Sequence, residues 1–339
     1  MAFVDRLKDL AALIEGRGFE PPRMPPSPDV AVEIAPDRIT AVRLGADRKT
    51  KALRVRSVAT RSIPEGAIEV ALARPNIVAP EPVLSALSQV LGAVGASEQR
   101  LSVLLPDHVA RVALLPFATL PRTRRELLEL VRFRMAKSLP FKVDEAVMDM
   151  TVLSARGGPA GAAVLAVFMH RAVLEQYETL FTSSGYWPGL VGLSTFEIYN
   201  LFHRALEAQR RPDKDTLLLN VTPHYLAVLI FRGDELIFYR CKPHASADED
   251  LIKGVRREIY TSLAFYQEKL MGRGVGRAAL RAVSVPSAPL RDGLAAEIGC
   301  PVDLINLTQV VPLGEAVTLE AEGASLAAAA AGAIFGRRA

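Results

Sequence analysis

TLLLNVTPHYLAVLIFRGDELIFYR, residues 216–240, contains three short apolar runs in close succession. The loop 222–224 and the turn 232–235 separate the runs, and Gly233 and Asp234 accept turn dihedrals that most residues resist. The pattern predicts a buried strand, a tight loop and a hairpin. Many nucleotide-binding folds place a phosphate loop between two such strands, but the loop 222–224 contains no glycine.

The length and the composition indicate two domains with sizeable cores. The chain has 339 residues, whereas a single domain usually has roughly 100–200. Half of the residues are hydrophobic. The 41 Lys and Arg residues against 37 Asp and Glu residues describe a mixed surface rather than the strongly basic field of a protein that coats nucleic acid.

The cysteines and the apolar runs favour the cytoplasm. Cys241 and Cys300 lack the spacing of metal ligands or of a CxxC motif, and so few cysteines indicate a reducing compartment. No run approaches the roughly 18–20 apolar residues of a membrane span. The first residues lack the pattern of a secretion signal. We expect both thiols to be buried by packing.

We divide the chain into three parts. Residues 1–28 hold an amphipathic helix, expected at 2–16, and a proline-rich linker. The charges of this helix balance, which favours docking on the chain itself or on a partner over contact with a membrane. The first domain is expected at 29–212, with an inserted module at about 100–160. The second domain is expected at 213–339 and ends in an alanine-rich helix.

Strands and helices alternate along the body of the chain, which is typical of an α/β fold. Besides the strands of the opening stretch, we expect strands at 30–34, 39–44, 53–58, 101–105, 109–115, 162–168, 190–193, 282–285 and 302–305. Helices are expected at 84–94, 171–183, 196–210, 248–270 and 290–298. The glycines between 272 and 276 follow a helix rather than a strand, so they indicate a helix cap and a loop instead of a dinucleotide site.

The segment 120–153, LPRTRRELLELVRFRMAKSLPFKVDEAVMDMTVL, carries the most distinctive pattern. Thr123 and Glu126 stand at the spacing of a capping box, so they predict the start of a helix. Apolar residues follow at steps of three and four, and Pro140 is expected to end the helix.

The same segment is basic. Six of the residues from Arg122 to Lys137 are basic and two are acidic, but Phe133 is the only aromatic residue among them. A basic helix is compatible with a nucleic-acid module, whose affinity would fall steeply with salt. A solvated helix face beside an anionic neighbour is the alternative that we favour.

Three segments resemble the PilM proteins of type IV pilus assembly, which are actin-like and close in fold to the cell-division protein FtsA. The segments are 120–153, 163–201 and 258–270, and the run SLAAAAAGAIFGR at 325–337 looks like the closing helix of that family. The resemblance implies an α/β fold of the actin-like (ribonuclease H-like) kind, with two domains and a small α/β module inserted in the first domain.

In an actin-like fold, glycine-containing loops hold the phosphates of ATP, because glycine lets backbone N–H groups approach the oxygens. The resemblance places such loops here at Glu33, Ala35 and Asp37, at Asn220 and Thr222, and at Ser284 and Ser287. Each loop lacks glycine and contains proline, which has no N–H group. We therefore expect no nucleotide cofactor, no metal ion and no enzymatic activity. Glu33 and Asp37 remain carboxylates that could hold magnesium, which keeps an actin-like or sugar-kinase-like ATPase open as the alternative.

PilM-like proteins bind the cytoplasmic N-terminal tail of the single-span protein PilN in a groove beside the inserted module, and the resemblance implies the same here. It thus implies a scaffold on the cytoplasmic face of a bacterial inner membrane, in a type IV pilus or a type II secretion-like system. The resemblance also implies that other components of the platform are partners of this protein. It does not decide whether the protein forms a homo-oligomer. We expect the groove at Leu120, Val131, Met135, Leu139, Pro140 and Phe141. Any one of these residues could instead belong to the core of the module.

Overall fold

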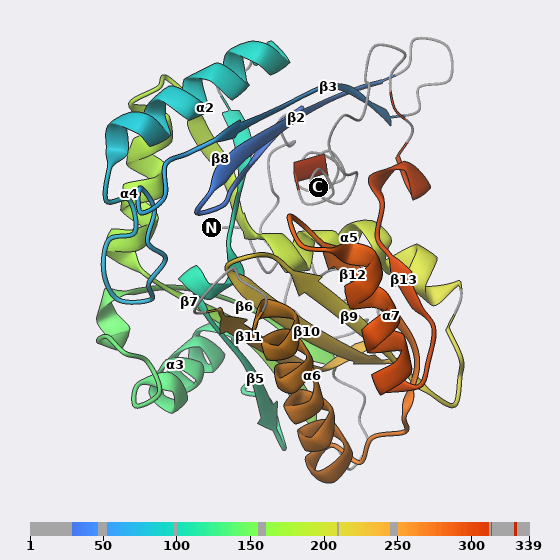
Figure 1. The fold of residues 1–339 in the computed structure, drawn as a ribbon. Helices are drawn as coiled ribbons and strands as arrows, with labels where there is room; N and C mark the ends of the chain where they lie inside the picture. Colours follow the sequence, from blue (N-terminus) through green and yellow to red (C-terminus); the bar gives the residue numbers. More distant parts are fainter. Residues whose placement is uncertain are drawn as a thin grey trace.

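The computed structural model describes residues 29–46, 53–97, 100–154, 161–208, 210–244, 250–311, 313 and 329–330. They form two five-stranded sheets and one three-stranded sheet (Figure 1). The helix expected at 2–16, the proline-rich linker and most of the closing helix lie outside the described residues.

The first sheet has the strand order β3-β2-β1-β4-β8. Its strands are β1 (Val30–Ile34), β2 (Arg38–Ala46), β3 (Leu53–Ser62), β4 (Arg100–Leu105) and β8 (Trp187–Leu193). The first three form an antiparallel meander, and β4 and β8 continue the sheet in parallel from β1. The helices of this domain are α2 (Pro80–Val94), α4 (Arg171–Thr182) and α5 (Ser194–Glu207).

Both faces of the first sheet are covered. Alternate residues of β1 and β2 pack in a core that includes α2, α4 and α5. The others, such as Ala31 and Val42, pack with Ala329 and Ala330, which are helical and fully buried. Small side chains at positions 329 and 330 therefore allow a close approach to the sheet, as the alanine-rich composition predicts.

The second sheet repeats the plan of the first, with the order β11-β10-β9-β12-β13. Its elements are β9 (Asp215–Val221), β10 (Tyr225–Arg232), β11 (Glu235–Pro243), α6 (Asp250–Lys269), β12 (Val275–Ala282), α7 (Ser287–Ile298) and β13 (Val302–Leu304). The strand, tight loop and hairpin predicted for 216–240 are confirmed as β9, β10 and β11.

The strand expected at 282–285 is wrong, because β12 spans Val275–Ala282 and takes in part of the expected loop. Arg277 and Arg281 interrupt the apolar pattern of β12 in the sequence. Both are stable in a strand because each has a carboxylate partner: Arg277 pairs with Asp303 and Arg281 pairs with Glu33.

The inserted module is a three-stranded sheet with the order β5-β7-β6 and one helix. Its elements are β5 (Arg111–Phe117), α3 (Arg124–Met135), β6 (Ala146–Ser154) and β7 (Ala162–His170). The expected bounds of about 100–160 differ from this range because β4 belongs to the first sheet and β7 extends to His170.

The predicted capping box at the start of α3 is confirmed. Thr123 Oγ1 accepts from the N–H of Glu126, and the Glu126 carboxylate accepts from the N–H of Thr123, both at 3.2 Å. The regular helix ends at Met135, before Pro140, in a turn in which the N–H groups of Ser138 and Leu139 bond to the carbonyl of Met135. Within the described residues, no helix has the length and hydropathy needed to cross a bilayer.

Candidate functional site

Three loops meet where the two large sheets face each other. They follow β1, β9 and β12, and they are the loops for which the family resemblance implies phosphate contacts. Arg38 Nη1, from the first loop, donates to Ser284 Oγ of the third loop at 2.7 Å and to its neighbour Asp37 at 2.8 Å. His224 Nε2, from the second loop, lies 3.2 Å from Asp37 Oδ1. The first loop therefore contacts both of the others directly.

Below these loops, an arginine joins the two domains. Arg281 of β12 donates to both carboxylate oxygens of Glu33 in β1, with distances of 2.8 and 3.1 Å from Nη2 and 3.1 Å from Nη1. Arg281 Nη1 also lies 3.3 Å from Asn220 Oδ1 in β9. The Arg281 side chain is 1% exposed. A fixed guanidinium thus stands between the two positions where the resemblance implies ligands of a magnesium nucleotide.

A second buried network continues from Asn220 into the first domain. Asn220 Nδ2 donates to Thr195 Oγ1 at 2.7 Å and to the hydroxyl oxygen of Tyr225 at 3.0 Å. The N–H of Thr195, at the start of α5, donates to Asp107 Oδ1 at 3.0 Å. Tyr239 of β11 donates to Asp107 Oδ2 at 3.1 Å. Asp107 therefore holds the start of α5 and the edge of the second sheet together.

Asp107 and Asp37, two of the carboxyl groups of this region, differ in their acidity. Burial raises the pKa of Asp107 to about 6, because the hydrogen bonds from Thr195 and Tyr239 only partly offset the loss of water. Burial by itself would also raise the pKa of Asp37, but the contact with His224 and the charge of Arg38 outweigh it and lower the pKa below its ordinary value.

The first and second loops do not fit a phosphate cradle. In the second loop, the N–H groups of Thr222, His224 and Tyr225 all bond within the loop, and Pro223 has none. In the first loop, the N–H groups of Ala35 and Arg38 do the same. A phosphate cradle needs several free N–H groups that point at one place. In these two loops, most of the N–H groups that such a cradle would use already donate to acceptors within the loop.

The residues expected at the vestigial nucleotide loops are only partly brought together. Five of them lie in the contacts just described, namely Glu33, Asp37, Asn220, Thr222 and Ser284. Ala35 bonds within its loop, and Ser287 is the first residue of α7. Within the described residues, no group of three or more His, Cys, Asp or Glu side chains could hold a metal ion.

Sequence reasoning missed Arg281 and Asp107, the two charged residues on which these networks depend. Arg281 follows the apolar run Ala278–Leu280, and a charged residue inside a buried strand needs a partner. That signal marks Arg281 as unusual, but it does not identify Glu33 as the partner.

The residues expected for the partner groove are mostly core. Val131, Met135 and Leu139 are buried in the module, between α3 and its sheet. Leu120 and Phe141 are partly buried and pack against the same core. Pro140 lines a cavity.

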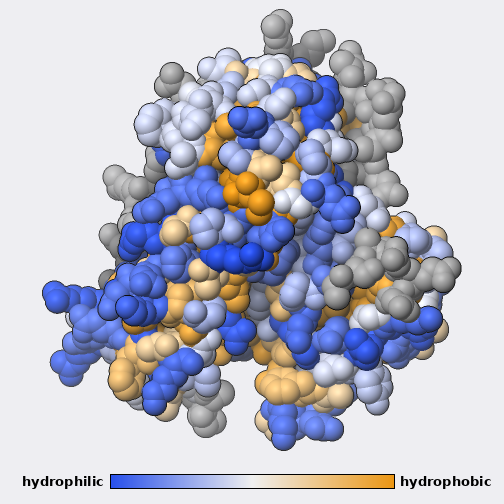
Figure 2. Space-filling view, turned by 60° about the vertical axis from the view of Figure 1, so that its left-hand side comes forward, coloured by the Kyte–Doolittle hydropathy of each residue, from blue (hydrophilic) through white to orange (hydrophobic). Residues whose placement is uncertain are grey.

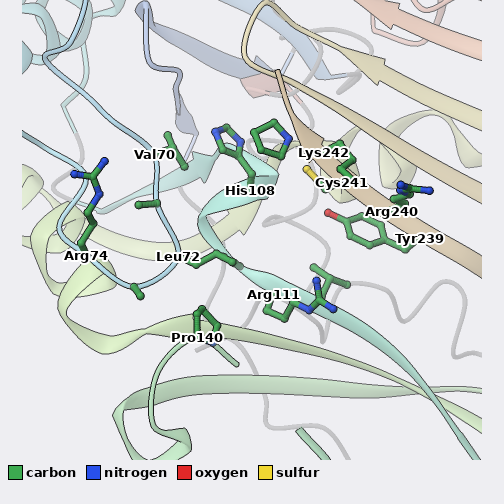
Figure 3. Close-up of a pocket in the computed structure, with 15 residues that line it drawn as sticks. Val70, Leu72, Arg74, His108, Arg111, Pro140, Tyr239, Arg240, Cys241 and Lys242 are labelled. Atoms are coloured by element: carbon green, nitrogen blue, oxygen red, sulfur yellow. The ribbon is translucent and has the colours of Figure 1, made fainter. Parts of the chain in front are cut away.

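That cavity has a volume of about 800 Å³ and lies between the module and both domains (Figure 3). Its walls are the loop 70–74, the beginning of β5 and the end of β11. Figure 3 shows Leu72 and Pro140 on one side of it and Tyr239 and Arg240 on the other. The basic side chains of the lining are Arg74, Arg111, Arg240 and Lys242.

Two sheet edges form part of this cavity. β11 is the outer strand of the second sheet, and β5 is an outer strand of the module sheet. The outer strand of a sheet presents backbone N–H and C=O groups that can pair with an added strand. His108 also lines the cavity as a neutral group, because burial and two neighbouring histidines lower its pKa to about 3. The cavity therefore combines backbone donors and acceptors with apolar and cationic side chains.

Comparison with solved structures supports the fold. A chain of the structure described as "PilM-PilN type IV pilus biogenesis complex" matches 92% of this chain and 99% of its own length, with a TM-score of 0.77 and 17% sequence identity. The actin-like two-domain fold with an inserted module, implied by the sequence resemblance, is confirmed.

Two further structures are less similar. A Bacteroides thetaiotaomicron protein with an actin-like ATPase fold and unknown function has a TM-score of 0.49 at 9% identity, covering 83% of this chain and 91% of its own. The cytoplasmic domain of EpsL, an inner membrane component of the type II secretion system of Vibrio cholerae, has a TM-score of 0.45 at 12% identity, covering 75% and 81%. Neither a protein-family profile nor a curated protein sequence matches the chain.

Proposed function

We propose that this protein is a non-enzymatic scaffold of the assembly platform at the bacterial inner membrane, in a type IV pilus or a type II secretion-like system. It binds the cytoplasmic tail of a PilN-like single-span membrane protein. The likeness to a chain of a PilM–PilN complex supports this proposal. So does the cavity of about 800 Å³ beside the inserted module, which is the single observation that carries it.

The cavity suits an extended peptide. The outer strands β5 and β11 offer main-chain hydrogen bonds on its two sides, and an added strand obtains affinity from such bonds and specificity from side-chain pockets. Val70, Leu72 and Val112 supply apolar surface for alternate side chains. The groove thus differs from the one expected at α3, because α3 uses its apolar residues for the core of the module.

We propose further that the scaffold does not use ATP. The guanidinium of Arg281 already supplies a positive charge beside Glu33 and Asn220, where an ATPase would need magnesium and phosphates. The fold then serves as a rigid frame that places the cavity between three sheets. Binding of the partner tail tethers the scaffold to the membrane.

The test is binding of a synthetic peptide with the sequence of the cytoplasmic tail of a PilN-like single-span membrane protein. Fluorescence polarisation with the purified full chain is expected to show saturable binding at micromolar concentrations. Leu72→Asp puts a charge into the cavity wall and is expected to abolish it. Val78→Asp is the matched control, because Val78 follows in the same loop, is 58% exposed and does not line the cavity.

Two results would count against the proposal. One is no binding at tens of micromolar peptide to a chain whose melting shows that it is folded. The other is equal weakening by Leu72→Asp and Val78→Asp, which would place the peptide elsewhere or indicate a general loss of structure.

A further inference from the structure

The outward face of α3 carries an aromatic ring that the fold does not use. Phe133 is 80% exposed. The other apolar side chains of the helix point the opposite way, and Leu127, Val131 and Met135 are buried in the core of the module. A Phe side chain left in water forgoes about 1.5–3 kcal/mol of burial. Phe133 is thus apolar surface that a contact could bury, and its basic surroundings decide which kind of contact.

The surroundings of Phe133 are strongly basic. Between residues 122 and 142 there are seven Lys and Arg residues and two Glu residues. Three of the cations are held within the module: Arg124 pairs with Asp149, Arg125 pairs with Glu129, and Arg134 stacks on Phe117. The other four are exposed and make no ion pair among the described residues: Arg122, Arg132, Lys137 and Lys142.

The ring and one of these four cations, Arg132, share one side of α3, and Lys137 follows in the turn after the helix. Residues three, four, seven and eight positions apart lie on the same helix face, which groups Arg125, Glu129, Arg132, Phe133 and Ala136. In Figure 1, α3 lies at the outer end of the module, away from both large sheets. Figure 2 turns this side of the molecule forward and shows a mainly hydrophilic surface with small separate apolar patches.

We propose that this face of α3 and the turn that follows it form a peripheral contact with an anionic lipid bilayer, centred on Arg132, Phe133 and Lys137. The boundary between headgroups and acyl chains offers anionic groups for the cations and an apolar region for the ring. Nucleic acid would satisfy the cations only, because one aromatic side chain gives no platform for successive bases.

The contact adds to the proposed function but does not depend on it. Lys137 lies three residues before Pro140, which lines the cavity. A chain that rests on the bilayer through α3 therefore keeps the cavity near the membrane from which a partner tail emerges. The charges and the exposed ring would bind lipid equally well in the absence of any partner.

The experiment is sedimentation of the purified full chain with vesicles of phosphatidylcholine alone or of phosphatidylcholine with phosphatidylglycerol. We expect binding only to the anionic vesicles, and weaker binding at high salt. Each basic residue near an anionic surface contributes about 1 kcal/mol, a factor of about five. Arg132→Gln with Lys137→Gln is thus expected to lower the partition coefficient about 25-fold. Phe133→Ser is expected to lower it at least about tenfold, the factor that corresponds to the lower end of the free energy of burying a Phe side chain.

The matched control is Arg257→Gln with Lys269→Gln, which removes two exposed cations from α6. It is expected to bind vesicles as strongly as the unchanged chain does. Every variant keeps the rest of the chain, so any vesicle binding by other segments is the same in all of them. Equal binding to neutral and anionic vesicles would overturn the proposal, as would equal weakening by the control.

Two further measurements separate the alternatives. A short DNA duplex at the same salt is expected to bind more weakly than anionic vesicles. Tighter binding of the duplex, lost in the α3 variants, would make the surface a nucleic-acid site instead. Tail-peptide binding in solution is expected to be unchanged by the α3 variants, so failure of the lipid contact and failure of the proposed function are distinguishable.

Discussion

Arg281 in β12 and Glu33 in β1, 248 positions apart in the sequence, form a two-point ion pair at the centre of the molecule. The pair joins the second domain to the first without a ligand. Two charges removed from water are stable only when they meet each other with good geometry. The contact between the two domains at this point therefore depends on both side chains being present or on both being replaced.

Loss of one member of the pair should be far more harmful than loss of both. Arg281→Met leaves Glu33 buried and unpaired, and it is expected to lower the free energy of unfolding by about 3–5 kcal/mol in urea denaturation. Glu33→Leu in addition should restore most of that loss, because apolar residues can replace a buried ion pair. Arg74→Met, in the exposed Arg74–Glu69 pair, is the control and should cost less than about 1 kcal/mol. A double variant no more stable than Arg281→Met would show that the unpaired Glu33 carboxylate is not the source of the loss.

Nucleotide should not stabilise the protein. A ligand at about 100 times its Kd adds roughly 2.7 kcal/mol to the stability of the folded state. We expect no shift of the melting temperature with millimolar ATP and magnesium. Asn220→Asp with Thr222→Gly should show none either, because Arg281 and Pro223 remain. A nucleotide-dependent rise in the unchanged chain would restore the ATPase alternative.

Asp107 should make stability fall as the pH rises. Its pKa is about 6 in the folded chain against an ordinary value of 3.8, so the folded state binds the proton more tightly and the stabilisation is lost between these two values. The difference corresponds to about 3 kcal/mol. Asp107→Asn keeps an oxygen for Thr195 and an amide for the Tyr239 hydroxyl, and it stays uncharged. Urea denaturation should find the variant more stable than the unchanged chain at about pH 7.5, with a difference that shrinks towards about pH 4.5. A variant that is less stable at both pH values would contradict this assignment.

Asp215 should behave differently, although it is buried as well. Burial alone would raise its pKa, but hydrogen bonds from Arg232 at 2.9 and 3.2 Å and from Tyr266 at 2.7 Å lower it below 3.8. The stabilisation is therefore present above pH 3.8 and is lost only below it. Asp215→Asn is expected to cost about 1.5–3 kcal/mol, and the cost should be the same at about pH 7.5 and about pH 4.5. A cost that disappears between these two values would show that the carboxylate is not held by Arg232 and Tyr266.

Much of the local structure could be predicted because local signals specify it. The capping box of Thr123 and Glu126 sets the start of α3, and the loop 222–224 and the turn 232–235 set the hairpins of the second sheet. These features depend on residues within a few positions of each other. The resemblance implies a groove beside the module, but the apolar residues expected to line it are also the ones that a small module needs for its own core.

By itself, the sequence determined the loss of glycine from the three loops, the family resemblance and most of the elements, but not β6 or the bounds of β12. The tertiary structure alone decided that Arg281 meets Glu33 and Asn220, that Asp107 links α5 to β11, and that the loop 70–74, β5 and β11 enclose a cavity. The reason is physical. An arginine inside a strand opposes the local apolar pattern, and only a carboxylate brought to it by the packing of the other domain offsets the cost of its burial.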